Sequence, residues 1–173
     1  MSDLGNLSYF QGVEFIDTGE RVFLHQKKYV QYILKRFIMS NCETVATPLK
    51  TRTKLKKETH DEFVSATLYK RIFGSLKYLC NTILYIYQSV GLLNRFMEKP
   101  QECLLIAIKR VSRYIKGMID HGVLMSRQKK TSTDVKGYGY TDSDFSGDQD
   151  EKKSIAFYIF MIKGALIFCS SGK

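Results

Sequence analysis

Residues 100–117 read PQECLLIAIKRVSRYIKG and contain the clearest helical pattern in the chain. Proline is favoured at the first position of a helix, an acidic side chain in the first turn complements the helix dipole, and glycine often caps the end. The apolar side chains recur at intervals of three and four, which places them on one face. They are Leu104, Ile108, Val111 and Ile115. We therefore predict a helix from Pro100 to Gly117 with one face in a core.

Helical spacing also precedes this stretch. Residues 26–39, 68–83 and 90–97 carry apolar side chains at similar intervals, so we predict three further helices. Periodicity fails between residues 41 and 62, where Pro48 and a run of cationic side chains predict a basic linker. The run contains Lys50, Arg52, Lys54, Lys56 and Lys57.

Both ends of the chain have the composition of β-strands. Residues 8–16 and 21–24 are rich in aromatic and β-branched side chains and flank the turn sequence DTGE at 17–20, which predicts a β-hairpin. Three further strands are predicted after the polar stretch 126–134. They cover residues 136–145, 154–163 and 165–170. The predicted fold class is therefore α+β, with a domain junction near residue 130.

Charge is distributed unevenly along the chain, which has 27 lysines and arginines, 17 aspartates and glutamates, and a net charge of +10. Residues 25–130 hold 21 basic and 7 acidic side chains, whereas residues 131–173 hold 5 basic and 6 acidic. A strongly basic segment is typical of a polyanion binder, because neutralising phosphates releases condensed counterions. The alternative is a solvated, lysine-rich surface that keeps the protein in solution.

Two groups of cations are the candidate contacts for nucleic acid. Lys109, Arg113 and Lys116 recur at helical spacing on the last predicted helix, apart from its apolar face. Lys27 and Lys28 lie outside the apolar stripe of the first predicted helix. We predict that these side chains bind the phosphate backbone; the alternative is that they are merely solvated.

The cysteines and the apolar stretches bear on metal binding and location. The four cysteines lie far apart, with no C-x-x-C pair and no histidine at ligand spacing, so we expect no zinc site and a reducing compartment. Residues 1–10 lack the apolar core of a signal peptide. The longest apolar stretch, residues 155–169, is interrupted and too short to span a bilayer. We expect an intracellular protein without membrane contact, in the cytoplasm, the nucleus or an organelle.

Acidic side chains are concentrated in YTDSDFSGDQDE, residues 140–151. An EF-hand calcium loop starting at Asp142 would need a bidentate glutamate where Lys153 stands, and helices where strands are predicted. A second hypothesis is catalytic: Asp142, at a strand end, could hold a divalent ion of a two-metal nuclease if other elements supply further carboxylates. The third hypothesis is a solvated acidic turn. The residues disfavour calcium and leave the other two hypotheses open.

Six segments together resemble the Pol polyprotein of copia-type LTR retrotransposons. The family pattern M-x-D-L-G-x-x-x-Y-F-L-G-I-E is similar to MSDLGNLSYFQGVEF, and Q-x-K-Y-x-x-x-L-L-x-x-F-x-M-x-x-C-x-x-x-x-T-P-L to QKKYVQYILKRFIMSNCETVATPL. The next block is similar to LYKRIFGSLKYLCNT and SVGLLNRFMEKP. Further on, A-x-K-R-x-L-R-Y-x-K-G-T-x-x-x-G-L resembles AIKRVSRYIKGMIDHGVL, and Y-S-D-S-D-W-A-G-D-x-x-x-R-K-S resembles GYTDSDFSGDQDEKKS. These blocks cover nearly the whole chain in the family's order.

The resemblance implies three parts. Residues 1–24 would be the last hairpin of the reverse transcriptase palm, residues 25–126 a mainly helical thumb and connection region, and residues 135–173 a partial RNase H-like domain with a three-stranded antiparallel sheet. The parent polyprotein makes DNA from RNA and cleaves the RNA of RNA–DNA hybrids, both with magnesium. The implied partners are RNA–DNA hybrid or other nucleic acid, bound without sequence preference, and the remainder of Pol. Asp142 corresponds to the first RNase H carboxylate, the catalytic and metal-ligand candidate.

The resemblance also implies that catalytic parts are missing. The polymerase Y-V-D-D motif would precede Met1, and the later RNase H carboxylates would follow Lys173. We therefore expect a truncated, catalytically inactive fragment that binds no magnesium stably. It would be either a residual non-specific nucleic-acid-binding module or a non-functional remnant. Departures such as Cys169 in place of a tryptophan are typical of a partly degenerate copy.

The strands after residue 135 generate a prediction about local stability. Three short strands without a covering helix are marginally stable and leave an apolar edge open. We expect the amide hydrogens of residues 135–173 to exchange faster than those of residues 100–116, as measured by mass spectrometry on the whole chain. Uniformly slow exchange in a monomeric sample would mean that the helical part covers the sheet.

Overall fold

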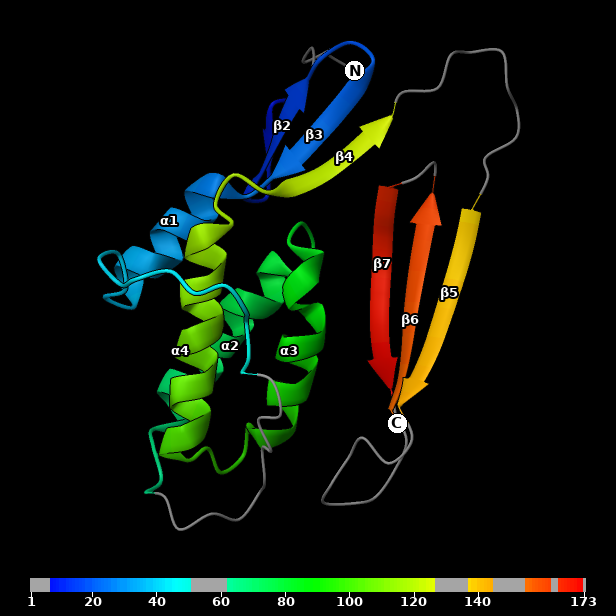
Figure 1. The fold of residues 1–173 in the computed structure, drawn as a ribbon. Coiled ribbons are helices and arrows are strands. Elements are labelled where there is room, and N and C mark those ends of the chain that lie inside the picture. The colour runs from blue at the N-terminus through cyan, green and yellow to red at the C-terminus, as the bar shows by residue number, and fades with distance from the viewer. Residues whose placement is uncertain (1–6, 51–61, 127–136, 145–154, 163–164, 173) are drawn as a thin grey trace, which may run out of the picture.

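The computed structural model describes residues 7–50, 62–126, 137–144, 155–162 and 165–172 (Figure 1). It confirms the α+β class, with an N-terminal antiparallel sheet, a helical region and a three-stranded antiparallel sheet. The strands are β1 (Tyr9–Phe10), β2 (Val13–Asp17), β3 (Arg21–His25), β4 (Gly122–Ser126), β5 (Gly137–Asp144), β6 (Ile155–Ile162) and β7 (Ala165–Gly172). The helices are α1 (Lys27–Arg36), α2 (Ala66–Leu79), α3 (Tyr87–Leu93) and α4 (Glu102–Gly117), with 3-10 turns η1 (Leu84–Ile86) and η2 (Asn94–Phe96).

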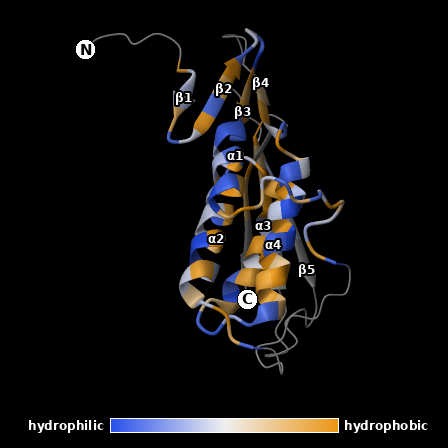
Figure 2. Ribbon diagram, turned by 90° about the vertical axis from the view of Figure 1, so that its left-hand side faces the viewer, coloured by the Kyte–Doolittle hydropathy of each residue, from blue (hydrophilic) through white to orange (hydrophobic). Residues whose placement is uncertain are grey.

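The main core lies between the four helices. Polar and apolar segments alternate along α1 and α2, as expected of amphipathic helices that bury one face (Figure 2). The predicted apolar face of α4 is fully buried, and α1, α2 and α3 all pack against this helix. Removing apolar surface from water contributes roughly 25 cal/mol per Å². This shared core is therefore the main source of stability in the helical region.

Several helix boundaries differ from the prediction: α2 covers residues 66–79 and α3 residues 87–93, where helices at 68–83 and 90–97 were predicted. At two other boundaries the backbone conformation gives the reason. α1 ends at Arg36, earlier than predicted, because Ile38 adopts the left-handed region with a φ of 58°. α4 begins at Glu102, later than predicted, because Gln101 is extended and pairs with Phe63 in an isolated bridge. Within the described ranges, no helix combines the length and the apolarity needed to cross a bilayer.

The first sheet has the strand order β1-β2-β3-β4 and includes a strand that the sequence analysis missed. The predicted hairpin consists of two successive hairpins, because Gln11 and Gly12 form a tight turn with φ values of 46° and 80°. β4 pairs antiparallel with β3, and His25 lies opposite Gly122. A Cβ atom at Gly122 would collide with the backbone of Leu24, so only glycine allows this close approach. β4 thus connects the end of the helical region to the N-terminal hairpin.

The second sheet has the strand order β5-β6-β7 and is partly covered by the helical region. β7 packs against α3 and lies near β4, and Cys169 is only 2% exposed. The expectation that nothing covers the sheet is therefore wrong at this strand. Ile159 lies opposite Cys169 on the same face, whereas Tyr158 and Phe160 point to the other face and are exposed.

The buried face of α4 gives a direct test of the core. Ile108→Ala removes a fully buried side chain and should lower the free energy of unfolding by about 2–5 kcal/mol, because it leaves a cavity. Ile106→Ala is the matched control in the same helix, because Ile106 is 62% exposed. The control should change stability by less than about 0.5 kcal/mol. Urea denaturation measures both variants, and equal losses would contradict the orientation of α4.

Candidate functional site

Two of the three cations in the predicted α4 stripe bind the chain's own backbone. Arg113 Nε donates a hydrogen bond to Glu43 O at 2.8 Å, and Lys116 Nζ donates one to Cys42 O at 2.7 Å. Lys109, the third cation, is exposed at the surface. The stripe therefore has a structural role that sequence alone did not predict: it fastens the segment that follows α1 onto α4.

Lys27 and Lys28, the other two predicted cations, have different partners. Lys27 Nζ lies 2.7 Å from Asp120 Oδ1, and this hydrogen bond raises the pKa of Lys27 and lowers that of Asp120. Lys28 Nζ lies 3.3 Å from Glu14 Oε2, and Lys28 N donates to Glu14 Oε1 at 3.0 Å. Partial burial raises the pKa of Glu14, but the hydrogen bonds from Lys28 outweigh it and the net pKa is lowered. These contacts fasten the start of α1 to β2 and to the segment before β4.

Aromatic rings alternate with cations on the exposed side of β1 and α1. Lys28 Nζ lies 5.7 Å from the ring centroid of Tyr9, and the Arg36 guanidinium carbon lies 5.9 Å from that of Tyr32. Lys28, Tyr32 and Arg36 are spaced by four residues, which places them on one side of the helix. Both rings are half-exposed. We call the following set the α1 face: Tyr9, Lys28, Tyr32, Lys35 and Arg36.

The α1 face has the chemistry of a polyanion site, and the sequence analysis found only part of it. An exposed ring can stack on a base, and a neighbouring cation can neutralise a phosphate. Lys28 was a predicted contact, whereas Tyr32 and Arg36 were missed although KKYVQYILKR contains the alternation of rings and cations. Tyr9 could not be assigned to this face from sequence, because only the fold brings β1 beside Lys28.

Asp142, the predicted catalytic and metal-binding carboxylate, lies in β5 opposite Phe157 of β6. Asp144 is the last residue of β5, whereas the rest of the acidic cluster, Asp148, Asp150 and Glu151, lies outside the described residues, as do residues 51–61 of the predicted basic linker. In the part of the chain that the structure describes, no three His, Cys, Asp or Glu side chains come together as metal ligands. Magnesium requires oxygen ligands in near-octahedral geometry. The role of Asp142 therefore stays a prediction.

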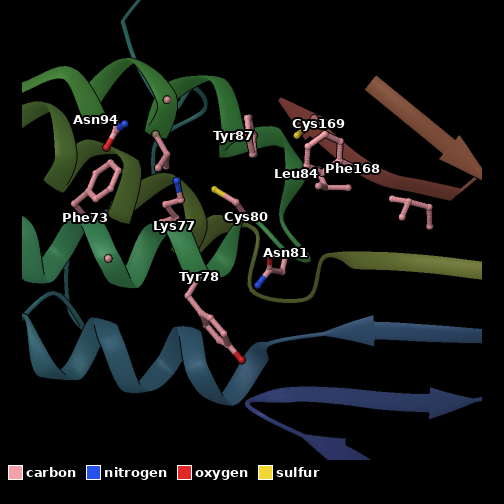
Figure 3. Close-up of a pocket in the computed structure, with 14 residues that line it drawn as sticks. Phe73, Lys77, Tyr78, Cys80, Asn81, Leu84, Tyr87, Asn94, Phe168 and Cys169 are labelled. Atoms are coloured by element: carbon pink, nitrogen blue, oxygen red, sulfur yellow. The ribbon is translucent and has the colours of Figure 1, made fainter. Parts of the chain in front are cut away.

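A cleft of ≈ 910 Å³ lies between α2, α3 and β7 (Figure 3). Phe73, Lys77 and Cys80 project from α2 towards α3, and Cys169 of β7 also lines the cleft. Burial raises the pKa of the Cys80 thiol to about 12 and that of Cys169 to about 11. Both thiols are therefore protonated at neutral pH. The sequence shows four separated cysteines, and only the fold places two of them at one cleft.

Comparison with known proteins finds relatives along the whole chain. The retrovirus-related Pol polyprotein from transposon RE1 of Arabidopsis thaliana is 32% identical over 173 residues, which are 100% of this chain and 12% of that protein. The corresponding Pol polyprotein from transposon TNT 1-94 of Nicotiana tabacum is 32% identical over 96% of this chain and 13% of its own length. An uncharacterized mitochondrial protein of Arabidopsis thaliana is 30% identical over 89% of this chain and 62% of its own length.

The chain spans about an eighth of the length of the two Pol polyproteins. No family model and no solved structure matches it.

The buried thiols generate a prediction about alkaline pH. Burial holds the pKa of Cys80 above its ordinary value, so the unfolded chain loses this proton at a lower pH than the folded chain. Stability should be fully present below pH about 9 and fall as pH rises towards 12, by at most about 1.4 kcal/mol per pH unit for each such group. Urea denaturation between pH 8 and 11 measures the slope. Cys80→Ala should make the slope shallower, and an unchanged slope would contradict the burial of this thiol.

Proposed function

Because the chain belongs to the family of copia-type retrotransposon Pol polyproteins, we propose that it is the segment in which the reverse transcriptase ends and the RNase H domain begins. The order of its elements supports this assignment: a hairpin, a helical region, then a three-stranded antiparallel sheet. The activities of the polyprotein would be RNA-directed DNA synthesis and cleavage of the RNA strand in RNA–DNA hybrids. The remainder of Pol would be a partner of this segment.

The role of this segment within the polyprotein is to hold nucleic acid without reading its sequence. The observation that carries this proposal is the α1 face, where exposed rings and cations alternate. Cations that neutralise phosphates release counterions from any sequence, and rings stack on any base. The net charge of +10 adds long-range attraction for a polyanion. An RNA–DNA hybrid is the ligand that fits the proposed place in the polyprotein.

Contacts with the first sheet and with α2 position the start of the helix that carries the α1 face. Lys28 contacts Glu14 through both its backbone N–H and its ammonium. His25 Nδ1 lies 3.6 Å from the same carboxylate and stacks on Phe23 with ring centroids 5.3 Å apart. Tyr29 packs edge-on against Tyr78 of α2 beneath the face, at 4.9 Å. The first sheet and α2 thus fix the start of α1 from two sides.

Metal-dependent chemistry in the polyprotein would use Asp142. The chemistry that magnesium would supply there is activation of a water molecule and stabilisation of the leaving oxygen of a phosphodiester. Asp142 would supply one carboxylate from β5, and the other ligands would come from elements outside the described residues. Nucleic-acid binding by the α1 face, not cleavage, is therefore the function that the described residues support best.

The salt dependence of hybrid binding tests the α1 face. For the double variant Lys28→Gln and Arg36→Gln, we expect the slope of log K against log salt to fall by about 1.8, because each phosphate contact contributes about 0.9. Tyr32→Ala should weaken binding with little change in the slope, because stacking is not ionic. Fluorescence anisotropy with a labelled RNA–DNA hybrid at several salt concentrations measures both effects.

A matched control separates the α1 face from overall charge. Lys70→Gln with Lys99→Gln removes the same charge from two exposed lysines that lie outside the α1 face. We expect this control to change the slope by less than half as much. Equal slopes for the two double variants would show that the α1 face is an ordinary solvated surface, and would favour a remnant without a selected ligand.

A further inference from the structure

Side chains from the first sheet cap the first N–H groups of α1. The N-cap residue, Gln26, makes no side-chain capping hydrogen bond, and the first turn of α1 contains no acidic residue. Lys27 N donates instead to His25 Nδ1 at 3.4 Å, and Lys28 N donates to Glu14 Oε1 at 3.0 Å. N–H groups in the first turn of a helix have no partner within the helix. One residue of β3 and one of β2 therefore supply the caps that the helix itself lacks.

The Nδ1 atom of His25 faces a donor and an acceptor at the same time. The donor is the Lys27 N–H at 3.4 Å, and the acceptor is Glu14 Oε1 at 3.6 Å. A neutral imidazole whose Nδ1 accepts a hydrogen bond carries its proton on Nε2, whereas a protonated imidazole donates from both nitrogens and accepts at neither. The backbone N–H is therefore a suitable partner only in the neutral state, and the carboxylate only in the protonated state.

Charged groups from β2, α1 and the segment before β4 surround this imidazole. The Glu14 carboxylate of β2 pairs with the Lys28 ammonium at 3.3 Å. Lys27 Nζ pairs with Asp120 Oδ1 at 2.7 Å. Asp120 in turn interacts electrostatically with the imidazole and with His121. Among the described residues, these two lysines and two carboxylates balance one another, so a proton on the imidazole adds a net positive charge.

We propose that His25 is a pH-sensitive switch whose Nδ1 atom binds the Lys27 N–H when neutral and the Glu14 carboxylate when protonated. Histidine is the side chain that ordinarily changes its charge between pH about 5 and about 8. The side chain of His25 is 10% exposed, so its ring is not sealed from solvent. The exchange shortens the distance from Nδ1 to Glu14 Oε1 to that of a charge-assisted hydrogen bond, about 2.7–2.9 Å.

The exchange of partners changes the charge that the α1 face presents. Lys28 belongs to this face, where it lies 5.7 Å from the ring centroid of Tyr9, and Glu14 is its counter-ion. When Nδ1–H donates to Glu14, two cations share the carboxylate and the Lys28 ammonium is held less strongly. The ammonium then neutralises a phosphate more readily, so a polyanion binds more tightly as pH falls. This effect on binding rests on the function proposed above, whereas the exchange of partners does not.

Amide exchange in the free, whole chain tests the exchange of partners. NMR measures the Lys27 amide against the Val30 amide, whose N–H donates to Gln26 O within α1 and serves as the internal reference. Between pH about 7.5 and about 5.5, the ratio of the two exchange rates should rise at least about threefold after correction for intrinsic rates, because Lys27 N–H loses its acceptor. His25→Asn offers an oxygen acceptor and takes up no proton, so its ratio should stay constant. A constant ratio in the native chain would overturn the proposal.

Hybrid binding at the same two pH values tests the effect on the α1 face. Fluorescence anisotropy at constant salt should show an affinity for a labelled RNA–DNA hybrid that rises at least about threefold at the lower pH, because one more phosphate is neutralised. His25→Asn should remove most of this rise. The matched control His121→Asn, at an exposed histidine beside Asp120, should retain it.

The outcomes separate this proposal from the proposed function. An equal rise in the His25→Asn and His121→Asn variants would overturn the effect of the switch on the α1 face. Absence of hybrid binding at both pH values would contradict the proposed function, while the Lys27 amide still decides whether the partners exchange.

Discussion

The buried face of α4 is the constraint on which the rest of the fold depends. α1, α2 and α3 all pack on this face, so a single helix determines how the others are arranged. The opposite side of α4 uses Arg110, Arg113 and Lys116 to bind the segment that follows α1. The chain then continues from α4 into β4, which completes the first sheet. The fold therefore uses the buried face of this helix and part of its outer side.

Buried hydrogen bonds make the arrangement of the helices more specific than apolar packing alone would. Thr82 Oγ1 donates a hydrogen bond to Gln26 Oε1 at 2.7 Å, and both residues are buried. This bond joins the residue before α1 to the end of α2. Tyr69 donates from its hydroxyl to Leu93 O at 3.0 Å and thereby joins α2 to α3. Another packing of these helices would lose both hydrogen bonds. The polar groups would then be buried without partners, which lowers stability.

The sequence predicted what depends on local pattern and missed what depends on distant partners. The spacing of Ile108 and its neighbours specifies the buried face of α4 before any partner is known. β4 was missed because five residues carry a weak strand signal and their partner strand lies near the N-terminus. The contact of Lys116 with the segment after α1 was also not predicted, since its partner is a backbone carbonyl, which every residue has. At the candidate sites, Lys28 was found from charge, whereas the contribution of Tyr9 and the cleft between α2, α3 and β7 require the folded chain.

The pairing of β3 with β4 has a consequence for the order of folding. The whole helical bundle is inserted between two neighbouring strands, from Gln26 after β3 to His121 before β4. Closing so long a loop in an unfolded chain loses much conformational entropy for a five-residue strand pair. A folded bundle brings Gln26 and His121 close together, so β4 can pair with β3 with little further loss of conformational entropy. We infer that the helical bundle folds first and that β4 pairs with β3 late in folding.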